Sequence, residues 1–470
     1  MNKKTKIVCS IGPSSVEKSV MREMILKGMN VARINFSHAT IEERHEVEMV
    51  VRELNEELRT NVAIMYDTKG PDFRTGNLVN DSINLVEGKT IRIVKEDILG
   101  TEEKFTVNYK NALDSISIGN IILLEDGLMK LEVIDKDDFG LTCKILVGGV
   151  LGNRKGINVP GVKLDMPFLS ETDVEDIKYA CINKGDFLAL SFVSSADDIK
   201  KVRDILKEMG DNHMQIVSKI ESDQAIANLE SIIDASDGIM VARGDLGVEV
   251  PMDKVPMLQK DMIKKSHEMG KFSIVATEML ASMYKSARPT RAEVSDIANA
   301  VLDGCDAVML SGETTIGKYP IEAVRYMADV CRSAEEYYNR EVHTISTNDN
   351  DVTTAIAKAV LASVSSLNVK AIVVPTSGGH SAKVMSNLRP QPIVLATCPN
   401  EEVARRLALN YGVYTKIVPE YDDLDKTVTE SKKEAVELFG LEKKDIIIVT
   451  GGIHDDPKIK QTNFLKIEEI

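Results

Sequence analysis

The sequence is poor in features that define several common protein classes. Its 470 residues include no tryptophan, 4% aromatic residues and six cysteines. The missing tryptophan decides nothing about fold or function. The cysteines show no paired spacing, which argues against a disulfide framework and a zinc site and fits a reducing cytosol. They are Cys9, Cys143, Cys181, Cys305, Cys331 and Cys398.

Basic residues are also in short supply. Lys plus Arg number 58 against 73 Asp plus Glu, which gives a formal net charge of -15. This charge argues against nucleic acid or an anionic membrane as the main partner, so a phosphate ligand would need a local basic cluster. No apolar run is long enough to span a bilayer, and the run after the opening MNKKT is too short for a signal peptide. We therefore expect a soluble, cytoplasmic protein.

What the sequence does have is a regular alternation of β-rich runs and amphipathic segments. The amphipathic segments carry apolar residues at helical spacing, and several end at glycine. Strict alternation of strand and helix predicts an α/β fold built on a parallel (β/α)8 TIM barrel. The expected strands are residues 6–12, 30–36, 62–67, 186–192, 214–221, 237–244, 272–278 and 306–312.

The alternation of strands and helices is interrupted between residue 71 and about residue 168. Alternating strands with turn signals and no convincing long helix predict an inserted all-β domain there. The insertion follows the third strand, at the end where barrel enzymes build their active sites. We interpret it as a lid over the site, the alternative being an insertion without a role.

A polar stretch at residues 336–354 leads into a separate α/β unit. Its expected strands are residues 370–376, 391–398, 414–418 and 444–452. The predicted domains are therefore a catalytic TIM barrel (1–70 and 169–345), the β lid (71–168) and a C-terminal α/β domain (346–470) for effector binding or oligomerisation.

The stretch SKIES, residues 218–222, places two charges at the end of an expected buried strand. Side chains two apart on a strand point the same way, so Lys219 and Glu221 share one face. On these residues alone, a solvated surface pair is the ordinary interpretation. Burying both charges is costly unless the site uses them.

Polar residues at other strand ends favour the second interpretation. Barrel enzymes gather their reactive groups at the carboxyl ends of the strands, and nearly every expected strand here ends in polar residues. They are Arg33, Asn35, Ser37 and His38; Asp67, Thr68 and Lys69; Asp245; Thr277 and Glu278; and Ser311, Glu313 and Thr314. All of these residues would lie at the same end of the barrel, which predicts a single site there.

Glu221 and Asp245 are carboxylates that the barrel would bring close together. Hard oxygen ligands of this kind are what Mg²⁺ prefers. Lys219 and Arg33 beside a divalent metal would stabilise a phosphoryl group in transit or the oxyanion of an enolate. For Arg33, the alternative to a functional role is a buried ion pair. For His38, the sequence favours neither a structural nor a functional role.

Two other motifs have more local interpretations. The amides of Gly244 and Asp245 precede an expected helix start, and such amides bind carboxylates or phosphates. Thr290 and Glu293 have the spacing of a capping box ahead of a helix. We assign that second motif a structural role.

Eight motifs carry a resemblance along nearly the whole chain. They are CSIGPSS, GMNVARINFSHAT, DTKGPDFRTG, NRKGINVPG, VSKIES, ASDGIMVARGDLGVEVP, RPTRAEVSDIANAVLDGCDAVMLSGET and GKYPIEAV. Together they resemble the pyruvate kinase family, most specifically in the barrel, less in the insertion and least at the carboxyl end.

The resemblance implies a phosphotransferase of the last step of glycolysis, which moves the phosphoryl group of phosphoenolpyruvate to ADP and gives pyruvate and ATP. It implies Mg²⁺ (or Mn²⁺) and K⁺ as cofactors and a homotetramer as the assembly. It also implies roles for single residues. These are Lys219, Arg33 and Thr277 in catalysis; the same three with Gly244 and Asp245 in substrate binding; Glu221 and Asp245 as Mg²⁺ ligands; Asn35, Ser37, Asp67 and Thr68 as K⁺ ligands; and His38, Arg74 and Lys155 at the nucleotide. Thr277 with water and the loop 311–313 are candidate proton relays to the enolate.

Three positions depart from the family pattern. Asp72 stands where the family usually has Glu, Glu278 where it has Gln, and Ala39 where it has Gly. None is a Mg²⁺ ligand or Lys219, so we expect activity, with any difference confined to K⁺ dependence and substrate affinity.

Two other function classes share features with this sequence. A Mg²⁺-dependent lyase acting through a pyruvate enolate would use the same barrel and the same cations. The lid, with Arg74 and Lys155 available for ADP, favours the kinase. A metabolite sensor would be expected to lack a charged ligand, and none is missing.

The C-terminal unit has a candidate effector loop. An apolar strand ends in Thr376, Ser377 and Gly379, with Ser381 in the helical pattern that follows. Hydroxyls and amides at a helix start suit a phosphate, and in related enzymes this loop binds a phosphorylated activator; a plain turn is the alternative. His380 stands where a Lys or Arg is common, and the loop 451–464 lacks a glycine-rich form. These features favour a sugar or nucleotide monophosphate over fructose 1,6-bisphosphate.

Overall fold

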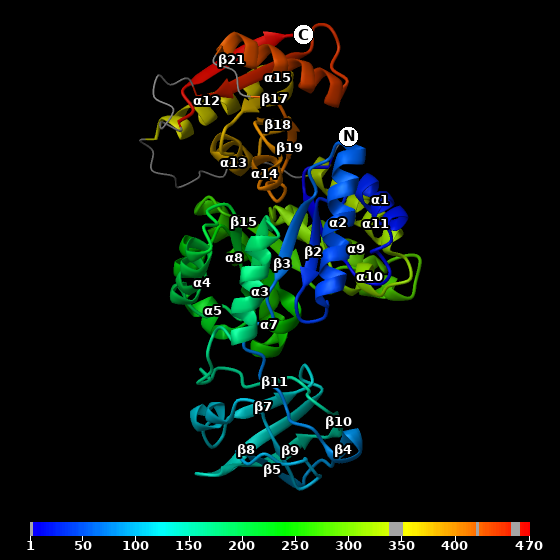
Figure 1. Ribbon diagram of the computed structural model, residues 1–470, viewed down its shortest axis with the longest axis vertical. Helices are drawn as coiled ribbons and strands as arrows, with labels where there is room; N and C mark the ends of the chain where they lie inside the picture. The colour runs from blue at the N-terminus through cyan, green and yellow to red at the C-terminus, as the bar shows by residue number, and fades with distance from the viewer. Residues whose placement is uncertain (1–2, 338–350, 420–422, 453–460) are drawn as a thin grey trace.

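The structure, a computed structural model, describes residues 3–337, 351–419, 423–452 and 461–470. Figure 1 shows three tiers: the barrel in the middle, the C-terminal unit at one end and the insertion at the other. No helix among these residues is long and apolar enough to cross a membrane. The predicted linker at 336–354 lies mostly outside the described residues.

The central tier is a closed barrel of eight parallel strands. All eight expected strands are confirmed, and with them the fold class. They are β1 (Lys6–Ser10), β2 (Val31–Asn35), β3 (Ala63–Asp67), β12 (Phe187–Leu190), β13 (Gln215–Ile220), β14 (Gly238–Ala242), β15 (Phe272–Ala276) and β16 (Ala307–Leu310). Each strand is almost wholly buried because apolar side chains fill the barrel on one face and meet the helices on the other.

Helices surround the barrel and begin where the sequence signals them. Thr40 and Glu43 form a capping box at the start of α2, and Thr290 and Glu293 form the predicted one at the start of α9. Gly28 ends α1 with a φ of 126°, a value that favours glycine. The helices are α1 (Lys18–Lys27), α2 (Ile41–Leu58), α3 (Glu171–Ile182), α4 (Ala196–Glu208), α5 (Asp223–Ala227), α6 (Leu229–Ala235), α7 (Arg243–Glu249), α8 (Val255–Glu268), α9 (Arg291–Leu302), α10 (Gly312–Thr315) and α11 (Pro320–Tyr337).

The insertion consists of two antiparallel-rich sheets around a hydrophobic core of its own. Residues 71–168 are all described and contain no α-helix, as the sequence predicts. One sheet has the order β11 (Ile157–Asn158), β7 (Ile121–Leu124), β8 (Met129–Asp137), β9 (Gly140–Val147), β5 (Thr90–Val94) and β6 (Lys104–Thr106); the other pairs β10 (Gly149–Gly152) with β4 (Ser82–Leu85).

The C-terminal unit is a five-stranded sheet with helices. Its strands lie in the order β19 (Val413–Ile417), β18 (Ile393–Cys398), β17 (Val369–Pro375), β20 (Ile446–Gly451) and β21 (Phe464–Glu469), and its helices are α12 (Val352–Ser366), α13 (His380–Asn387), α14 (Glu401–Arg405) and α15 (Leu424–Phe439). Four strands were expected and β21 was not. It is an antiparallel strand at the edge of the sheet. Its residues are charged and half-exposed, so the sequence contains no apolar run there that would predict a strand.

The C-terminal unit packs against the amino ends of the barrel strands. Arg405 pairs with Asp186 at 2.9 Å, and Arg389 pairs with Asp306 at 3.1 Å. Leu409 is fully buried in the same apolar cluster as the side chains that fill the barrel. The C-terminal unit therefore covers the end of the barrel opposite the insertion (Figure 1).

Candidate active site

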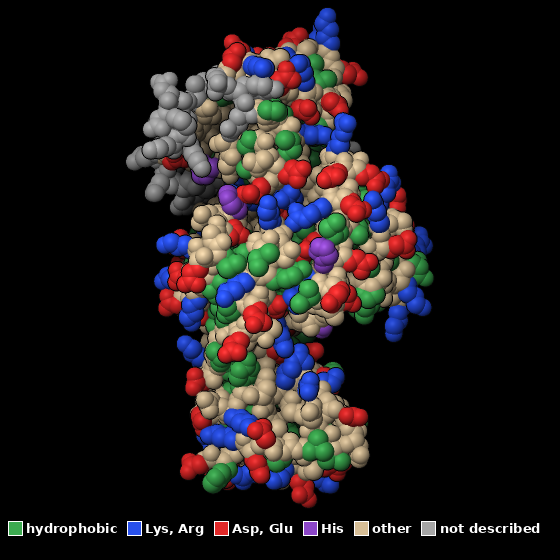
Figure 2. Space-filling model, in the orientation of Figure 1, with side chains coloured by type: hydrophobic (Ala, Val, Ile, Leu, Met, Phe, Trp, Pro, Cys, Tyr) green, Lys and Arg blue, Asp and Glu red, His purple; other side chains and the backbone are tan. Residues whose placement is uncertain are grey.

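A cavity of about 980 Å³ lies between the carboxyl ends of the barrel strands and the insertion. In Figure 2, Lys and Arg side chains gather at this waist of the molecule. Ten residues with a role implied by the family resemblance line the cavity, as does Lys69; the ten are Asn35, Ser37, His38, Asp67, Thr68, Arg74, Lys155, Lys219, Glu221 and Asp245. Arg33, Gly244 and Thr277, also described, are not among its lining residues, although Arg33 bonds Asp67 and Gly244 precedes Asp245 in the chain.

Lys219 is buried among acceptor oxygens at the floor of the cavity. Its Nζ lies 2.9 Å from Glu221 Oε1, 3.4 Å from Asp67 Oδ1 and 2.8 Å from Ser191 Oγ. The side chains of Lys219 and Glu221 are 12% and 1% exposed, which rules out a solvated surface pair. Burial lowers the pKa of Lys219, but the carboxylates of Asp67 and Glu221 outweigh it, and the net pKa is raised. The ammonium therefore keeps its charge at neutral pH.

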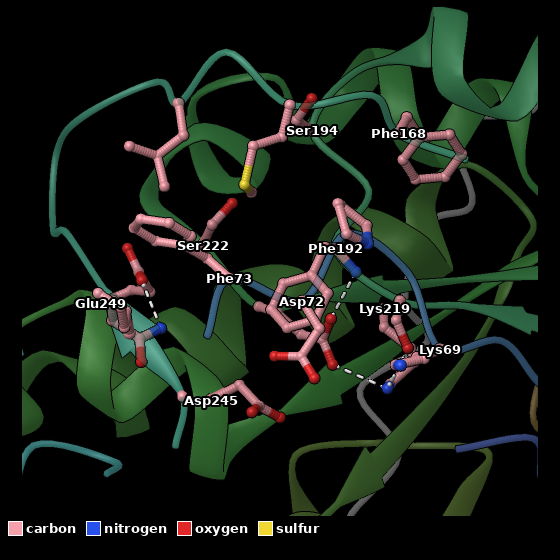
Figure 3. Close-up of a pocket in the computed structure, with 18 of the residues that line it drawn as sticks. Lys69, Asp72, Phe73, Phe168, Phe192, Ser194, Lys219, Ser222, Asp245 and Glu249 are labelled. Atoms are coloured by element: carbon pink, nitrogen blue, oxygen red, sulfur yellow. Dashed lines mark hydrogen bonds and ion pairs between the residues drawn. The ribbon is translucent and has the colours of Figure 1, made fainter. Parts of the chain in front are cut away.

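Two carboxylates, Glu221 and Asp245, line the cavity, and Figure 3 shows Asp245 there. Burial raises the pKa of Glu221 to about 7, with Lys219 opposing and Asp245 adding to the rise. Burial also raises the pKa of Asp245, with Lys219 opposing. A divalent cation between these oxygens would relieve this unfavourable burial of charge. The donor set fits Mg²⁺ or Mn²⁺.

The carboxylates would not hold such a metal alone. No group of three or more His, Cys, Asp or Glu within the described part of the chain is placed to hold a metal ion. Glu221 and Asp245 would therefore need oxygens of substrate or water to complete the shell, as is usual for Mg²⁺.

Arg33 belongs to the same charge network as Lys219. Its Nε donates to Asp67 Oδ2 at 2.7 Å and an Nη donates to Ser10 Oγ at 2.6 Å. The buried ion pair considered as the alternative is therefore present, but Asp67 turns its other oxygen toward Lys219. Burial opposes ionisation of Asp67, whereas Arg33 and Lys219 together hold its pKa below the usual range.

Comparisons with protein-family models, related sequences and a solved structure show the family of this chain. The barrel domain of pyruvate kinase matches residues 2–324, and the pyruvate kinase alpha/beta domain matches residues 354–468. The chain is 42% identical to a pyruvate kinase of Geobacillus stearothermophilus over all of its length and 81% of that protein, and 40% identical to one of Bacillus licheniformis over 99% and 80%. A crystal structure of a pyruvate kinase from Cryptosporidium parvum superposes with a TM-score of 0.94 at 37% identity and covers 99% of this chain and 96% of that one. The chain belongs to the pyruvate kinase family.

Thr277, the first residue after β15, has an unusual backbone conformation. Thr277 and Glu278 have φ values of 73° and 56°, a region that non-glycine residues seldom adopt. Thr277 Oγ1 accepts from the Gly244 amide at 2.8 Å and donates to the Ala276 carbonyl at 2.6 Å. The amide that we expected at the substrate carboxylate is thus bonded to Thr277.

Three further residues belong to this pyruvate kinase site and were not predicted from the sequence. Ser191 Oγ donates to the Thr68 carbonyl at 2.7 Å while accepting from Lys219, and the Phe192 amide donates to Glu221 Oε2 at 2.6 Å. Arg243 donates to the Thr277 carbonyl at 2.8 Å and pairs with Asp296. A signal existed for Ser191, because it ends the fourth expected strand just as the other polar residues end theirs. The Phe192 amide and the direction of the Arg243 side chain leave no signal in the sequence.

The remaining predicted residues lie on both sides of the cavity. Asn35 Oδ1 accepts from the Ser37 amide at 2.9 Å, and the side chains of Ser37 and His38 are exposed on the barrel side. On the insertion, Arg74 pairs with Asp72, and Lys155 pairs with Glu125 at 2.6 Å. Glu313, in the proposed relay loop, is buried and accepts from the amides of Leu280 and Ser311 at 3.0 and 2.8 Å. These amides give Glu313 a structural task between neighbouring loops.

The candidate effector residues lie together in the C-terminal unit. The Gly379 amide donates to Thr376 Oγ1 at 2.9 Å, Gly379 has a φ of 87°, and α13 begins at His380. Ser381 Oγ lies 2.5 Å from Thr462 Oγ1, which follows the loop whose residues 453–460 lie outside the described chain. Ser377 is exposed.

Proposed function

We propose that this enzyme transfers the phosphoryl group of phosphoenolpyruvate to ADP, giving pyruvate and ATP. The observation that carries the proposal is the buried contact of Lys219 with Glu221 and Asp67 at the floor of a cavity that also exposes Arg74 and Lys155. A phosphotransferase of this kind needs cations around the transferring group and a basic site for the nucleotide opposite it. The arrangement supports the kinase over a lyase acting through pyruvate enolate.

Each residue then has a chemical task. Arg33 and Lys219 hold the phosphoryl oxygens, and Lys219 also balances the charge that develops on the enolate oxygen. Thr277 and the Asp245 amide hold the substrate carboxylate, and the Gly244 amide joins them by exchanging its bond to Thr277 Oγ1 for one to the carboxylate. His38, Arg74 and Lys155 bind ADP, so that an oxygen of its terminal phosphate forms the new P–O bond as the bond to the enolate oxygen breaks. The enolate carbon then takes a proton, relayed by water with Thr277 or the loop 311–313.

The cation sites follow from the donor sets. Mg²⁺ or Mn²⁺ at Glu221 and Asp245 would supply Lewis-acid stabilisation of the phosphoryl and enolate oxygens. Asn35, Ser37, Asp67 and Thr68 offer the neutral and anionic oxygens that suit K⁺. Asp72 lines the same cavity and carries a carboxylate, so the side chain at this position is not a built-in cation that would replace K⁺.

A stoichiometric assay tests the function. With phosphoenolpyruvate, ADP, Mg²⁺ and K⁺, we expect one ATP for each pyruvate formed, measured by quantitative NMR or chromatography. Because charge stabilisation at such centres contributes about two to three orders of magnitude in rate, we expect omission of Mg²⁺ to abolish turnover and omission of K⁺ to slow it markedly. Pyruvate formed without ATP would overturn the kinase assignment, and full rates without K⁺ or NH₄⁺ would overturn the K⁺ site.

We propose that the chain is divided into a catalytic barrel (1–70 and 169–345), a lid (71–168) and an effector and oligomerisation domain (346–470). The family relation supports a cytoplasmic homotetramer with symmetric contacts between like faces. The free cysteines, all six of which are described, are compatible with that compartment.

The C-terminal loop is proposed to bind a monophosphate through Thr376, Ser377, Gly379 and Ser381. Activators of this kind change substrate affinity by about fivefold or more, so we expect glucose 6-phosphate, ribose 5-phosphate or AMP to lower the half-saturating phosphoenolpyruvate concentration by at least that factor. Ser377→Asp places a carboxylate where the phosphate would lie and should abolish the shift with maximal velocity nearly unchanged.

Ser365→Asp is the matched control, because Ser365 is also exposed but lies on α12. It should leave activation intact. If the whole panel of phosphates leaves the wild-type saturation curve unmoved, the loop is only a turn.

A further inference from the structure

The loop between β2 and α2, residues 36–39, carries two of the proposed ligands, Ser37 and His38. Within the loop, the Asn35 carbonyl accepts from the amides of His38 and Ala39 at 3.2 and 3.1 Å. Ser37 and His38 are exposed at the cavity. The position of both side chains therefore depends on what holds the two ends of this loop.

Arg44, in the first turns of α2, bonds both ends. Its Nε donates to the Ala39 carbonyl at 3.0 Å, and one Nη donates to the Phe36 carbonyl at 3.3 Å. Arg44 is only 8% exposed. The guanidinium group is a planar fork of fixed geometry, so two carbonyls bonded to it are held at a fixed separation.

A third bond fixes Arg44 itself. Its other Nη lies 2.7 Å from Asp176 Oδ1 on α3, a residue that is 7% exposed. The guanidinium also lies 4.2 Å from the ring centre of Phe36 and 5.5 Å from that of Tyr179, distances at which a cation is attracted to an aromatic face. Arg44 is thus held by an ion pair, by two hydrogen bonds to the loop and by two neighbouring aromatic rings.

The same face of α3 holds the connections to the insertion. Asp173, three residues before Asp176, accepts from the Gly70 amide at 3.0 Å and from the Ser170 amide at 2.9 Å. Gly70 is the last residue before the insertion, and Ser170 follows its return. Residues three apart lie on one side of a helix, so α3 anchors both the ligand loop, through Asp176, and the lid connections, through Asp173.

We propose that Arg44, fixed by Asp176, is a positioning residue for the loop 36–39, and that it sets the affinity of the site for the monovalent cation. This inference rests on the proposed role of Ser37 as a K⁺ ligand. Arg44 does not touch the reacting atoms. Its effect reaches the cation through the carbonyls of Phe36 and Ala39, which fix where Ser37 stands.

The test compares Arg44→Met with Arg52→Met. Arg52 also lies on α2 and donates to the Asn183 carbonyl just beyond α3 at 2.6 Å, so it joins the same two helices through a bond outside the loop 36–39. Residues that orient metal ligands change metal affinity by about tenfold or more, so we expect Arg44→Met to raise the half-saturating K⁺ concentration by at least that factor, with kcat at saturating K⁺ nearly unchanged. Arg52→Met should leave the K⁺ requirement as in the wild type.

A second readout does not depend on activity. Hydrogen exchange of the apo protein should be about tenfold faster in residues 36–40 of Arg44→Met and unchanged there in Arg52→Met, since only the first variant frees the loop ends. Asp176→Asn should shift both readouts in the same direction but less. Arg44→Lys, which keeps the charge but loses the planar fork, should fall between wild type and Arg44→Met, and it carries the test if the Met variant does not fold.

Ser37→Ala separates failure of the inference from failure of the proposed K⁺ site. If Ser37→Ala raises the K⁺ requirement and Arg44→Met does not, the K⁺ site stands and the positioning role of Arg44 is overturned. If Ser37→Ala has no effect on K⁺ activation, the proposed role of Ser37 fails. Unchanged exchange in residues 36–40 of Arg44→Met would overturn the inference in either case.

Discussion

Replacement of Lys219 by Met is expected to lower kcat by about three orders of magnitude, because it removes the fixed charge that we propose as the main stabiliser of the transition state. Met has a similar length and no charge, so the barrel strand should keep its packing. In this variant Asp67 and Glu221 lose the ammonium group that they share. Both carboxylates remain at the cavity, so we expect divalent metal binding to be intact. Steady-state kcat, together with Mn²⁺ binding followed by electron paramagnetic resonance, measures both effects.

Lys201→Met serves as the control for this experiment. Lys201 lines the same cavity, but its side chain is 61% exposed and its ion pair with Asp198 is long, at 3.7 Å. Exposed pairs of this kind contribute little, so we expect kcat within about threefold of the wild type. If the Lys219→Met loss appeared only in the Michaelis constant for phosphoenolpyruvate, Lys219 would be a binding residue and not a stabiliser of the transition state.

Replacement of Glu221 by Gln is expected to raise the half-saturating Mg²⁺ concentration by about a hundredfold, at the upper end of effects seen around metal sites, because one of the two proposed anionic ligands is lost. Gln keeps an oxygen that accepts from the Phe192 amide, so the turn after β12 should not change. Mg²⁺ titration of the rate and direct Mn²⁺ binding should report the same loss of affinity.

Glu249→Gln is the matched carboxylate control. Glu249 also lines the cavity, burial raises its pKa, and its Oε1 accepts from the Asn158 side chain at 2.8 Å (Figure 3). Gln can still accept that hydrogen bond, and we expect an unchanged Mg²⁺ requirement. Equal Mg²⁺ shifts in the two variants would mean that general negative charge in the cavity, and not ligation by Glu221, attracts the metal.

The barrel could be predicted from the sequence because each strand is buried on both faces and reads as a short apolar run. The predicted capping box of Thr290 and Glu293 was correct because its two hydrogen bonds are local. The edge strand β21 was missed since it is stabilised by pairing with β20, a long-range contact that its own residues do not signal.

The site shows the same division between local and long-range information. The common face of Lys219 and Glu221 follows from the two-residue period of a strand and could be predicted. The bond from Lys219 to Ser191 depends on how β12 and β13 are aligned, with Leu190 beside Ser218, and that register is set by the closed barrel. Arg243 and Arg44 act through carbonyl groups of distant or neighbouring loops, and a sequence pattern does not show which carbonyl a guanidinium group will reach.

Leu409 has a consequence for the order in which the chain acquires its structure during synthesis. It packs among the side chains that fill the barrel, yet it comes roughly a hundred residues after the last barrel strand. When that strand leaves the ribosome, the interior of the barrel still lacks one of its own side chains, and Asp186 and Asp306 still lack Arg405 and Arg389. A nascent chain that stops after β16 is therefore expected to expose an apolar opening beside two buried carboxylates, the kind of intermediate that chaperones recognise.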